Sequence, residues 1–334
     1  MTRKVDISTS TLFRFILIIL GLAFLYLIRD VLLILFFAVI ITAAVEAPVD
    51  WLKKKGVKRI FAVLIVYAIT FSILAGIVYL IIPPLGGQIK NLVVNLPDIT
   101  SRLGFGLESL QQKYQGLDVT GLLHSLANKV QGVTPDIFQT TFSFFGGIFS
   151  ALMVLVISFY LTFQENGLKK FLVSVVPGNH KEYVADLANR LEEKLGGWLR
   201  GELILMFSVG MLVFIGLTIL GIKYALVLAL LVGLLEIIPY FGPLIAVIPA
   251  VILAFFQAPW LAIAVAILYY VVQQLENYIL VPLIMKKTLG LNPVIIILSL
   301  LIGAKIGGVV GMVAAVPLAA MASVFLGDVF KDRE

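Results

Sequence analysis

The chain has 334 residues, of which 61% are hydrophobic and only 13% are charged. Soluble domains carry about 25% charged residues, so this composition excludes an ordinary soluble globular protein. The net charge of +6 comes without a basic, aromatic-rich soluble face, which argues against nucleic-acid binding. The sequence has no cysteine and only two isolated histidines, so we expect no disulfide, no metal and no cofactor.

Long apolar blocks predict an all-α integral membrane protein. A spanning helix needs about 20 mostly apolar residues, and its backbone polar groups must pair within the segment. We expect a first helix over about 11–28 and a second that ends near Pro48, joined by an outer turn at Arg29-Asp30 or as one bent helix. The basic cluster KKKGVKR (53–59) is expected in the cytoplasm, together with the N-terminus.

A third span over 60–82 closes an N-terminal unit of residues 1–84. Residues 85–140 balance acidic against basic side chains and repeat apolar residues at helical spacing, which predicts amphipathic helices on the outer side. The next unit, 141–201, combines a fourth span with an amphipathic helix along the cytoplasmic surface.

The last unit, residues 202–334, is apolar but repeatedly interrupted. After a fifth span over 202–221, the blocks 224–256 and 293–326 each have about 33 residues, which is short for two crossings of about 20 residues. We therefore predict two re-entrant hairpins, inverted relative to each other by a continuous span over 258–281. The whole chain would form about six full transmembrane helices and two hairpins, about eight hydrophobic segments, with both termini cytoplasmic.

Interrupted apolar segments indicate a transport site, because the freed backbone groups must face protein or a wet cavity. The alternative is a structural kink or a turn between short spans. Glu236 and Glu276 are candidate proton or cation carriers and Lys305 a candidate counter-charge; each could instead lie at the interface, with Lys305 at a hairpin tip. The full set of transport or binding candidates is Glu236, Pro239, Tyr240, Gly242, Pro243, Gln273, Gln274, Glu276, Asn277, Asn292 and Lys305.

A second set of residues is expected to pack or hinge helices: Pro249, Pro282, Gly303, Gly307, Gly311 and Pro317. The three glycines repeat every four residues, which predicts one small-residue stripe on a single helix. The sequence has no GxxxxGK[ST], HExxH or GxSxG motif, so we expect neither direct use of ATP nor an enzyme. A hydrolase built on Glu236 and Glu276 is the remote alternative.

Two C-terminal stretches resemble the autoinducer-2 exporter (AI-2E) family: LEIIPYFGPLIAVIPA (235–250) and QQLENYILVPLIMKKTLGLNPVIIILSLLIGAKIGGVVGMVAAVPLAA (273–320). The resemblance implies a permease or exporter of a small solute that is not directly ATP-driven, lies in the prokaryotic inner membrane and assembles as a homo-oligomer, with pentamers expected. Its partners would be membrane lipid and a small solute or ion. The alternatives are a sodium–proton antiporter and a non-transporting membrane scaffold.

Overall fold

A computed structural model describes residues 9–76, 79–80, 149–174, 176–285 and 291–331. Within these ranges the regular structure is entirely helical, and five helices are long and apolar enough to cross a membrane. Four shorter apolar helices accompany them. The predicted all-α integral membrane fold is confirmed, whereas the predicted outer segment 85–140 lies outside the described residues.

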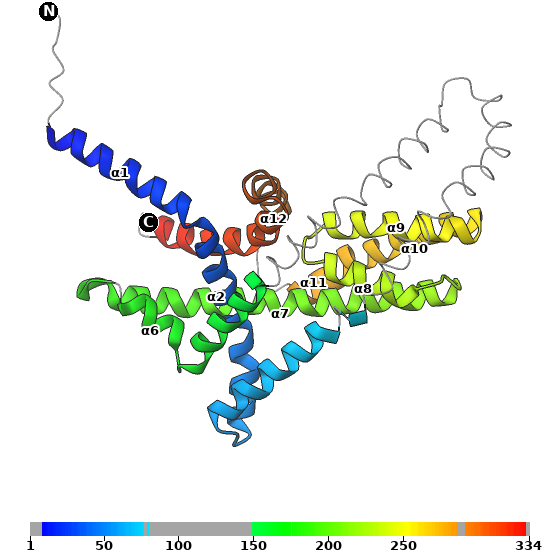
Figure 1. The fold of residues 1–334 in the computed structure, drawn as a ribbon, viewed down its shortest axis with the longest axis horizontal. Coiled ribbons are helices and arrows are strands. Elements are labelled where there is room, and N and C mark those ends of the chain that lie inside the picture. Colours follow the sequence, from blue (N-terminus) through cyan, green and yellow to red (C-terminus); the bar gives the residue numbers. More distant parts are fainter. Residues whose placement is uncertain (1–8, 77–78, 81–148, 175, 286–290, 332–334) are drawn as a thin grey trace, which may run out of the picture.

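Helices α1 (Thr9–Leu27) and α2 (Arg29–Lys54) are joined through Ile28 alone. The Ile28 N–H donates to Phe24 O at 3.0 Å, and the Leu32 N–H donates to Ile28 O at 3.0 Å, so helical hydrogen bonding continues across the junction. The chain bends there without reversing (Figure 1). The bent-helix alternative therefore describes this segment, rather than an outer turn at Arg29-Asp30.

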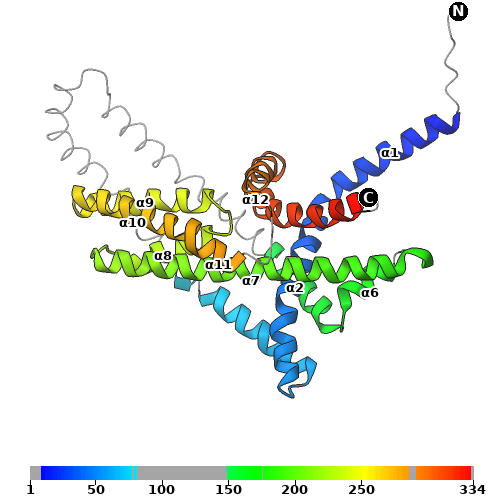
Figure 2. The ribbon, with the colours of Figure 1, turned by 180° about the vertical axis from the view of Figure 1, so that it is seen from behind.

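Helix α7 (Lys181–Ile219) is the long axis of the molecule and crosses α2 near its middle (Figures 1 and 2). The short helices α6 (Gly167–Ser174) and η1 (Gly178–His180) precede it. We expected a surface helix up to residue 201 and a separate span from residue 202. This expectation is wrong, because α7 runs without a break through both segments. Its glycines lie where neighbours approach closely: a Cβ at Gly196 would be 2.2 Å from Ala43 O, and one at Gly201 would be 2.9 Å from Met285 Sδ.

Helix α2 continues past Pro48 to Lys54, although we expected it to end near this proline. A proline within a helix cannot donate to the carbonyl four residues earlier, here that of Ala44. Arg200 of α7 supplies a donor instead: its Nη1 lies 3.4 Å from Ala44 O and 3.3 Å from Ala43 O. The contact between the two helices thus satisfies the carbonyl that Pro48 leaves unpaired.

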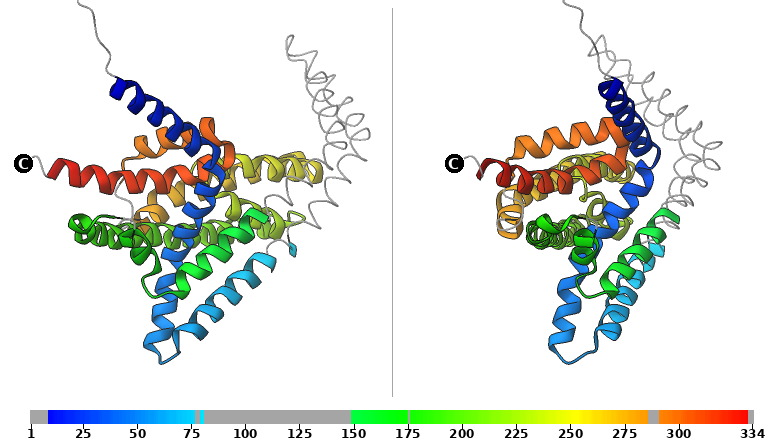
Figure 3. Two further views of the ribbon diagram at one scale, coloured as in Figure 1. Left: turned by 60° about the vertical axis from the view of Figure 1, so that its left-hand side comes forward. Right: turned by 90° about the vertical axis from the view of Figure 1, so that its left-hand side faces the viewer.

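Helix α2 also packs against the apolar helices Arg59–Gly76 and Phe149–Phe163 (Figure 3). Polar side chains are paired inside this bundle: the Tyr67 hydroxyl lies 3.0 Å from Ser158 Oγ and 3.1 Å from Thr162 Oγ1. Arg59 Nη2 lies 2.7 Å from Glu46 Oε1. The apolar core of the bundle consists of Val45, Val49, Ala62, Val63 and Tyr67.

The interrupted block 224–256 forms a hairpin of α8 (Ala225–Leu235) and α9 (Phe241–Gln257). The chain reverses over residues 236–240, where Tyr240 has a φ of 66°. A Cβ at Gly242 would lie 1.9 Å from Leu235 O, so the two arms meet at this glycine. The hairpin packs on the C-terminal half of α7 and on α10 (Pro259–Leu275), which continues through a π-helix, η2 (Glu276–Leu280), into α11 (Val281–Met285).

Helix α12 (Pro293–Lys331) is the second hairpin. Its helical geometry breaks at Gly307 and at Gly308, which has a φ of 58°, a value that favours glycine. The two arms fold back on each other (Figure 3). A Cβ at Gly303 would lie 2.3 Å from Gly311 O. The prediction of one glycine stripe on a single helix is therefore wrong: Gly303 and Gly311 face each other from opposite arms.

Candidate functional site

A cavity of about 280 Å³ lies where the tip of the α8–α9 hairpin meets the middle of α7, the η2–α11 segment and α12. Five separate stretches of the chain supply its walls, so it forms only when both hairpins pack against α7. Its lining consists of Trp198, Glu202, Leu205, Glu236, Pro239, Tyr240, Glu276, Asn277, Val281, Pro282, Met285, Leu291, Pro293, Ile296 and Val316.

Three glutamates from three different elements line this cavity. Glu202 belongs to α7, Glu236 follows the last residue of α8, and Glu276 is the first residue of the π-helix. Their exposed fractions are 3%, 2% and 4%. Ionisable groups buried within membrane-spanning segments are costly, and they mark ion or substrate pathways. Their convergence on one cavity singles it out as the candidate functional site.

Glu236 and Glu276 both line the cavity, so two buried carboxyl groups face the same space. An ionised carboxylate only accepts hydrogen bonds, so two carboxyl groups bond directly when one of them carries a proton. Gln273 Nε2 donates to Glu276 Oε2 at 2.9 Å. Glu236 Oε2 is buried without a hydrogen-bond partner, and so is Trp198 Nε1 in the same wall. The site thus gathers buried carboxyl groups and leaves polar atoms of its wall without partners.

The sequence around Glu236 explains its position at the hairpin tip. The Glu236 N–H still bonds to Val232 O at 2.9 Å, so the residue extends α8 by one helical bond. Pro239 then lacks an N–H, and the left-handed backbone at Tyr240 turns the chain into α9. Glu236 is therefore fixed at the point where the hairpin arm ends against α7.

The π-helix positions Glu276. The Val281 N–H bonds to Glu276 O, five residues earlier, rather than to the residue four earlier as in an α-helix. Pro282 follows, and it cannot donate to Tyr278 O in a regular α-helical turn. A wide π turn accommodates such a proline, and turns of this kind occur frequently at functional sites. As a result α11 presents Val281, Pro282 and Met285 to the cavity.

The profile of the AI-2E family of transporters matches residues 15–331, nearly the whole chain. The chain belongs to the AI-2E transporter family. Three relatives, each named as a candidate transport protein, are YueF and YrrI of Bacillus subtilis and YhhT of Escherichia coli K12. YueF is 28% identical over 298 residues, which cover 85% of this chain and 80% of YueF. YrrI is 26% identical over 319 residues (93% and 90%), and YhhT is 26% identical over 302 residues (90% and 84%).

The family match confirms the resemblance seen in the sequence. This AI-2E family member is a multi-pass membrane transporter; the buried Glu202 and Glu276 lie within its long apolar helical segments, and the buried Glu236 lies at the tip between two shorter apolar helices. None of the three relatives has a name that states a solute.

The structure brings five of the predicted transport or binding residues of this AI-2E transporter to the cavity: Glu236, Pro239, Tyr240, Glu276 and Asn277. Pro282, predicted as a packing or hinge residue, also lines it. Gln273 reaches it through its bond to Glu276. Gly242 and Pro243 are buried in the first turn of α9 just behind the tip. Gln274 is half-buried on α10 and is not part of the lining.

The remaining predicted residues of the AI-2E transporter are not part of the cavity lining. The Asn292 Oδ1 accepts a hydrogen bond from the Val294 N–H at 2.9 Å, so this residue caps the first arm of α12. Lys305 is exposed two residues before Gly307, which agrees with a hairpin-tip lysine rather than a counter-charge in the cavity. Pro249 lies inside α9 and Pro317 inside the second arm of α12.

Glu202 was not among the predicted site residues, because it stands at the start of an apolar stretch where an interfacial carboxylate is expected. Helical spacing gives a signal that could have identified it. Trp198, Glu202 and Leu205 lie four and three residues apart, so they share one face of α7, and all three line the cavity. A glutamate on the same helical face as buried apolar residues points into the protein.

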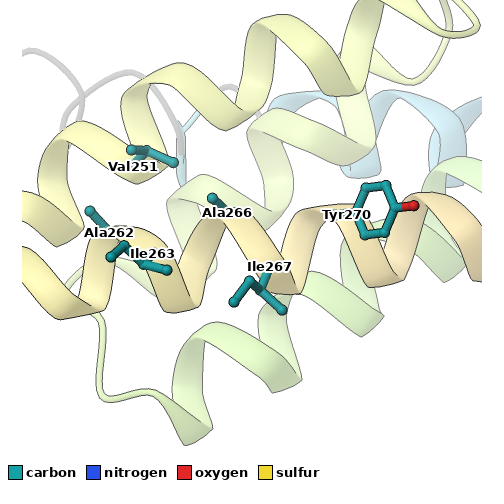
Figure 4. A pocket seen from close by; sticks show the side chains of 6 residues that line it. All are labelled: Val251, Ala262, Ile263, Ala266, Ile267 and Tyr270. Atoms are coloured by element: carbon teal, nitrogen blue, oxygen red, sulfur yellow. The ribbon is translucent and has the colours of Figure 1, made fainter.

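A second hollow of the AI-2E transporter is an apolar groove of about 450 Å³ on α9 and α10. Val251, Ala262, Ile263, Ala266 and Ile267 line it, with Tyr270 at one end (Figure 4). The groove offers no polar atom except the Tyr270 hydroxyl. It therefore lacks the groups that would bind an ion or a polar solute.

Proposed function

We propose that this AI-2E family member is a secondary transporter that exports a small solute in exchange for protons. The observation that carries the proposal is the convergence of two buried carboxyl groups, those of Glu236 and Glu276, on one cavity. A pair that shares one proton can release it when the carboxyl groups separate, and it can take up a proton when they meet again. With no P-loop in the sequence, the driving force would be a gradient rather than ATP.

Coupling follows from where the two carboxyl groups are attached. Glu236 lies on the tip of a helical hairpin, whereas Glu276 lies on the π turn of a different element. Bringing two ionised carboxylates together in a poorly solvated site is unfavourable, so closure of the pair requires a proton. A solute that displaces the hairpin tip would therefore also displace the proton.

Proteoliposomes with a trapped pH dye test this proposal. Autoinducer-2 and a panel of small solutes are added, and the internal pH is followed after each addition. We expect a solute-dependent proton flux that falls at least about tenfold in Glu236→Gln and Glu276→Gln. Glu182→Gln, on the exposed first turn of α7, is the matched control. Wild-type solute-dependent proton flux in both cavity variants would refute the assignment of the proton carrier.

A sodium–proton antiporter is the second candidate. Three carboxyl groups face one cavity, and none of its described lining residues is basic, which favours a cation as the other ligand. In that case sodium alone should change the internal pH of the proteoliposomes, and the change should require Glu236 or Glu276. A non-transporting scaffold would move neither solutes nor protons.

We further propose that the protein lies in a prokaryotic inner membrane, with both termini cytoplasmic, as a homo-oligomer. The pentamer is an expectation from the family resemblance. Native mass measurement of the detergent-solubilised protein tests it, and a monomeric mass would refute it.

A further inference from the structure

We infer that the cavity binds a small organic cation, an ammonium group carried on an apolar body. This inference deepens the proposed function by naming a class of solute, and it rests on that proposal for transport though not for binding. The observations behind it are the charge of the cavity, its unpaired polar atoms, its apolar walls and its size.

The polar atoms of the cavity favour a ligand that donates hydrogen bonds and carries positive charge. Glu202, Glu236 and Glu276 place three carboxyl groups in one wall, and carboxyl groups are the natural partners of a cationic donor. None of the described lining residues is a lysine or an arginine that could neutralise them. Glu236 Oε2 is buried without a partner, and an unpaired buried acceptor is costly until a donor reaches it.

The remaining walls are unsuited to a bare metal ion. Ions such as Ca²⁺ take about six to eight oxygen ligands. Here the polar side-chain groups of the lining are the three carboxyl groups, the Asn277 amide, the Tyr240 hydroxyl and the Trp198 indole N–H, and most other lining residues are aliphatic side chains or prolines. An apolar ligand body buries such walls favourably.

The aromatic residues and the size of the cavity narrow the ligand further. Trp198 and Tyr240 both line the cavity, and aromatic rings attract organic ammonium groups. Because liquid water occupies about 30 Å³ per molecule, the cavity of about 280 Å³ has room for about nine water-sized groups. Trp198 Nε1, a donor without a partner, could in addition bind a hydroxyl or carbonyl oxygen of the ligand.

A fluorescence titration tests the inference on the full chain in lipid nanodiscs. The sequence contains three tryptophans, so Trp51→Phe with Trp260→Phe leaves Trp198 as the reporter in the cavity. The probes are benzylammonium and benzyl alcohol, which have similar shapes but differ in charge. We expect saturable binding of benzylammonium that is at least about tenfold tighter than that of benzyl alcohol, as a charge-assisted contact requires.

Variants and competitors sharpen this test. Glu202→Gln and Glu236→Gln should weaken benzylammonium binding, whereas Glu182→Gln should not. Sodium should fail to displace the bound probe. Equal binding of the two probes, or displacement by sodium, would overturn the inference, and this comparison needs no variant to fold. Proton-coupled transport without benzylammonium binding would overturn the inference and leave the proposed function standing. Benzylammonium binding without any proton flux would support the inference and refute the proposed proton-coupled transport.

Discussion

Replacement of Gly303 or Gly311 by alanine should open the α12 hairpin. A Cβ at Gly303 would lie 2.3 Å from Gly311 O, and a Cβ at Gly311 would lie 2.1 Å from Gly303 O. Ordinary nonbonded contacts are about 3.5 Å, so the arms must separate by about 1 Å. Overpacking of this kind costs about 1–3 kcal/mol, and the contact is with backbone, which cannot rotate away. Alanine regains about 1 kcal/mol through helix propensity, which leaves a net loss of up to about 2 kcal/mol.

Unfolding of the purified protein in mixed micelles, with increasing denaturing detergent, measures this loss of stability. Gly307→Ala is the matched control, because a Cβ there meets no atom within 4 Å and the φ of −134° is open to alanine. We expect Gly303→Ala and Gly311→Ala to unfold earlier than wild type and Gly307→Ala to unfold with it. A destabilised Gly307→Ala beside an unchanged Gly303→Ala would refute the interpretation of α12 as a packed hairpin.

Three further predictions concern the rest of the molecule. Tyr67→Phe removes the buried hydroxyl and its two hydrogen bonds, so the free energy of unfolding should fall by about 0.5–1.5 kcal/mol in the same micelle assay, and an unchanged value would contradict the network. Lys53 holds the pKa of Glu165 below its ordinary value through a hydrogen bond; this stabilisation is present above the unfolded pKa and is lost as pH falls through the folded one. Lys53→Met should therefore be less stable than wild type at neutral pH, and the two should converge below the ordinary pKa of glutamate, which is about 4.3. Arg190 Nη1 and Nη2 each lie 2.7 Å from a carboxylate oxygen of Asp328, so Arg190→Lys and Asp328→Asn should have non-additive effects in a double-mutant cycle; additive effects would show that the pair does not join α7 to α12.

The two hairpins can be predicted from the sequence because proline and glycine residues mark the points where their helices are interrupted. Pro239 and Gly242 mark the tip of the first hairpin, and Gly307 lies at the break of α12, since these residues either lack a donor or permit unusual backbone angles. Helix continuity was harder to predict. Pro48 predicts a helix end, because its missing N–H leaves the carbonyl of Ala44 unpaired. The helix continues because Arg200, 152 residues later in the sequence, donates to that carbonyl.

The candidate site could be predicted from the sequence only where its residues stand next to a helix interruption. Glu236 and Glu276 stand next to visible interruptions, so their role could be proposed from the sequence. Glu202 stands in an unbroken helix, and only the packing of both hairpins against α7 brings it to the same cavity. Asn292 was predicted as a site residue, but its side-chain oxygen instead accepts a hydrogen bond from the backbone N–H of Val294 in its own helix.

The π turn at Glu276–Leu280 sets the rotation of the following helical segment about its axis, as well as the position of Glu276. It contains one residue more per turn than an α-helix, in which successive residues are about 100° apart. If Val281 N–H shifted its bond from Glu276 O to the next carbonyl, everything beyond the turn would rotate about the helix axis by about that angle. Pro282 and Met285 would then leave the cavity wall, and Asn277 and Glu276 would change their spacing relative to them. A single hydrogen-bond shift could therefore change the lining of the cavity while both hairpins stay in place.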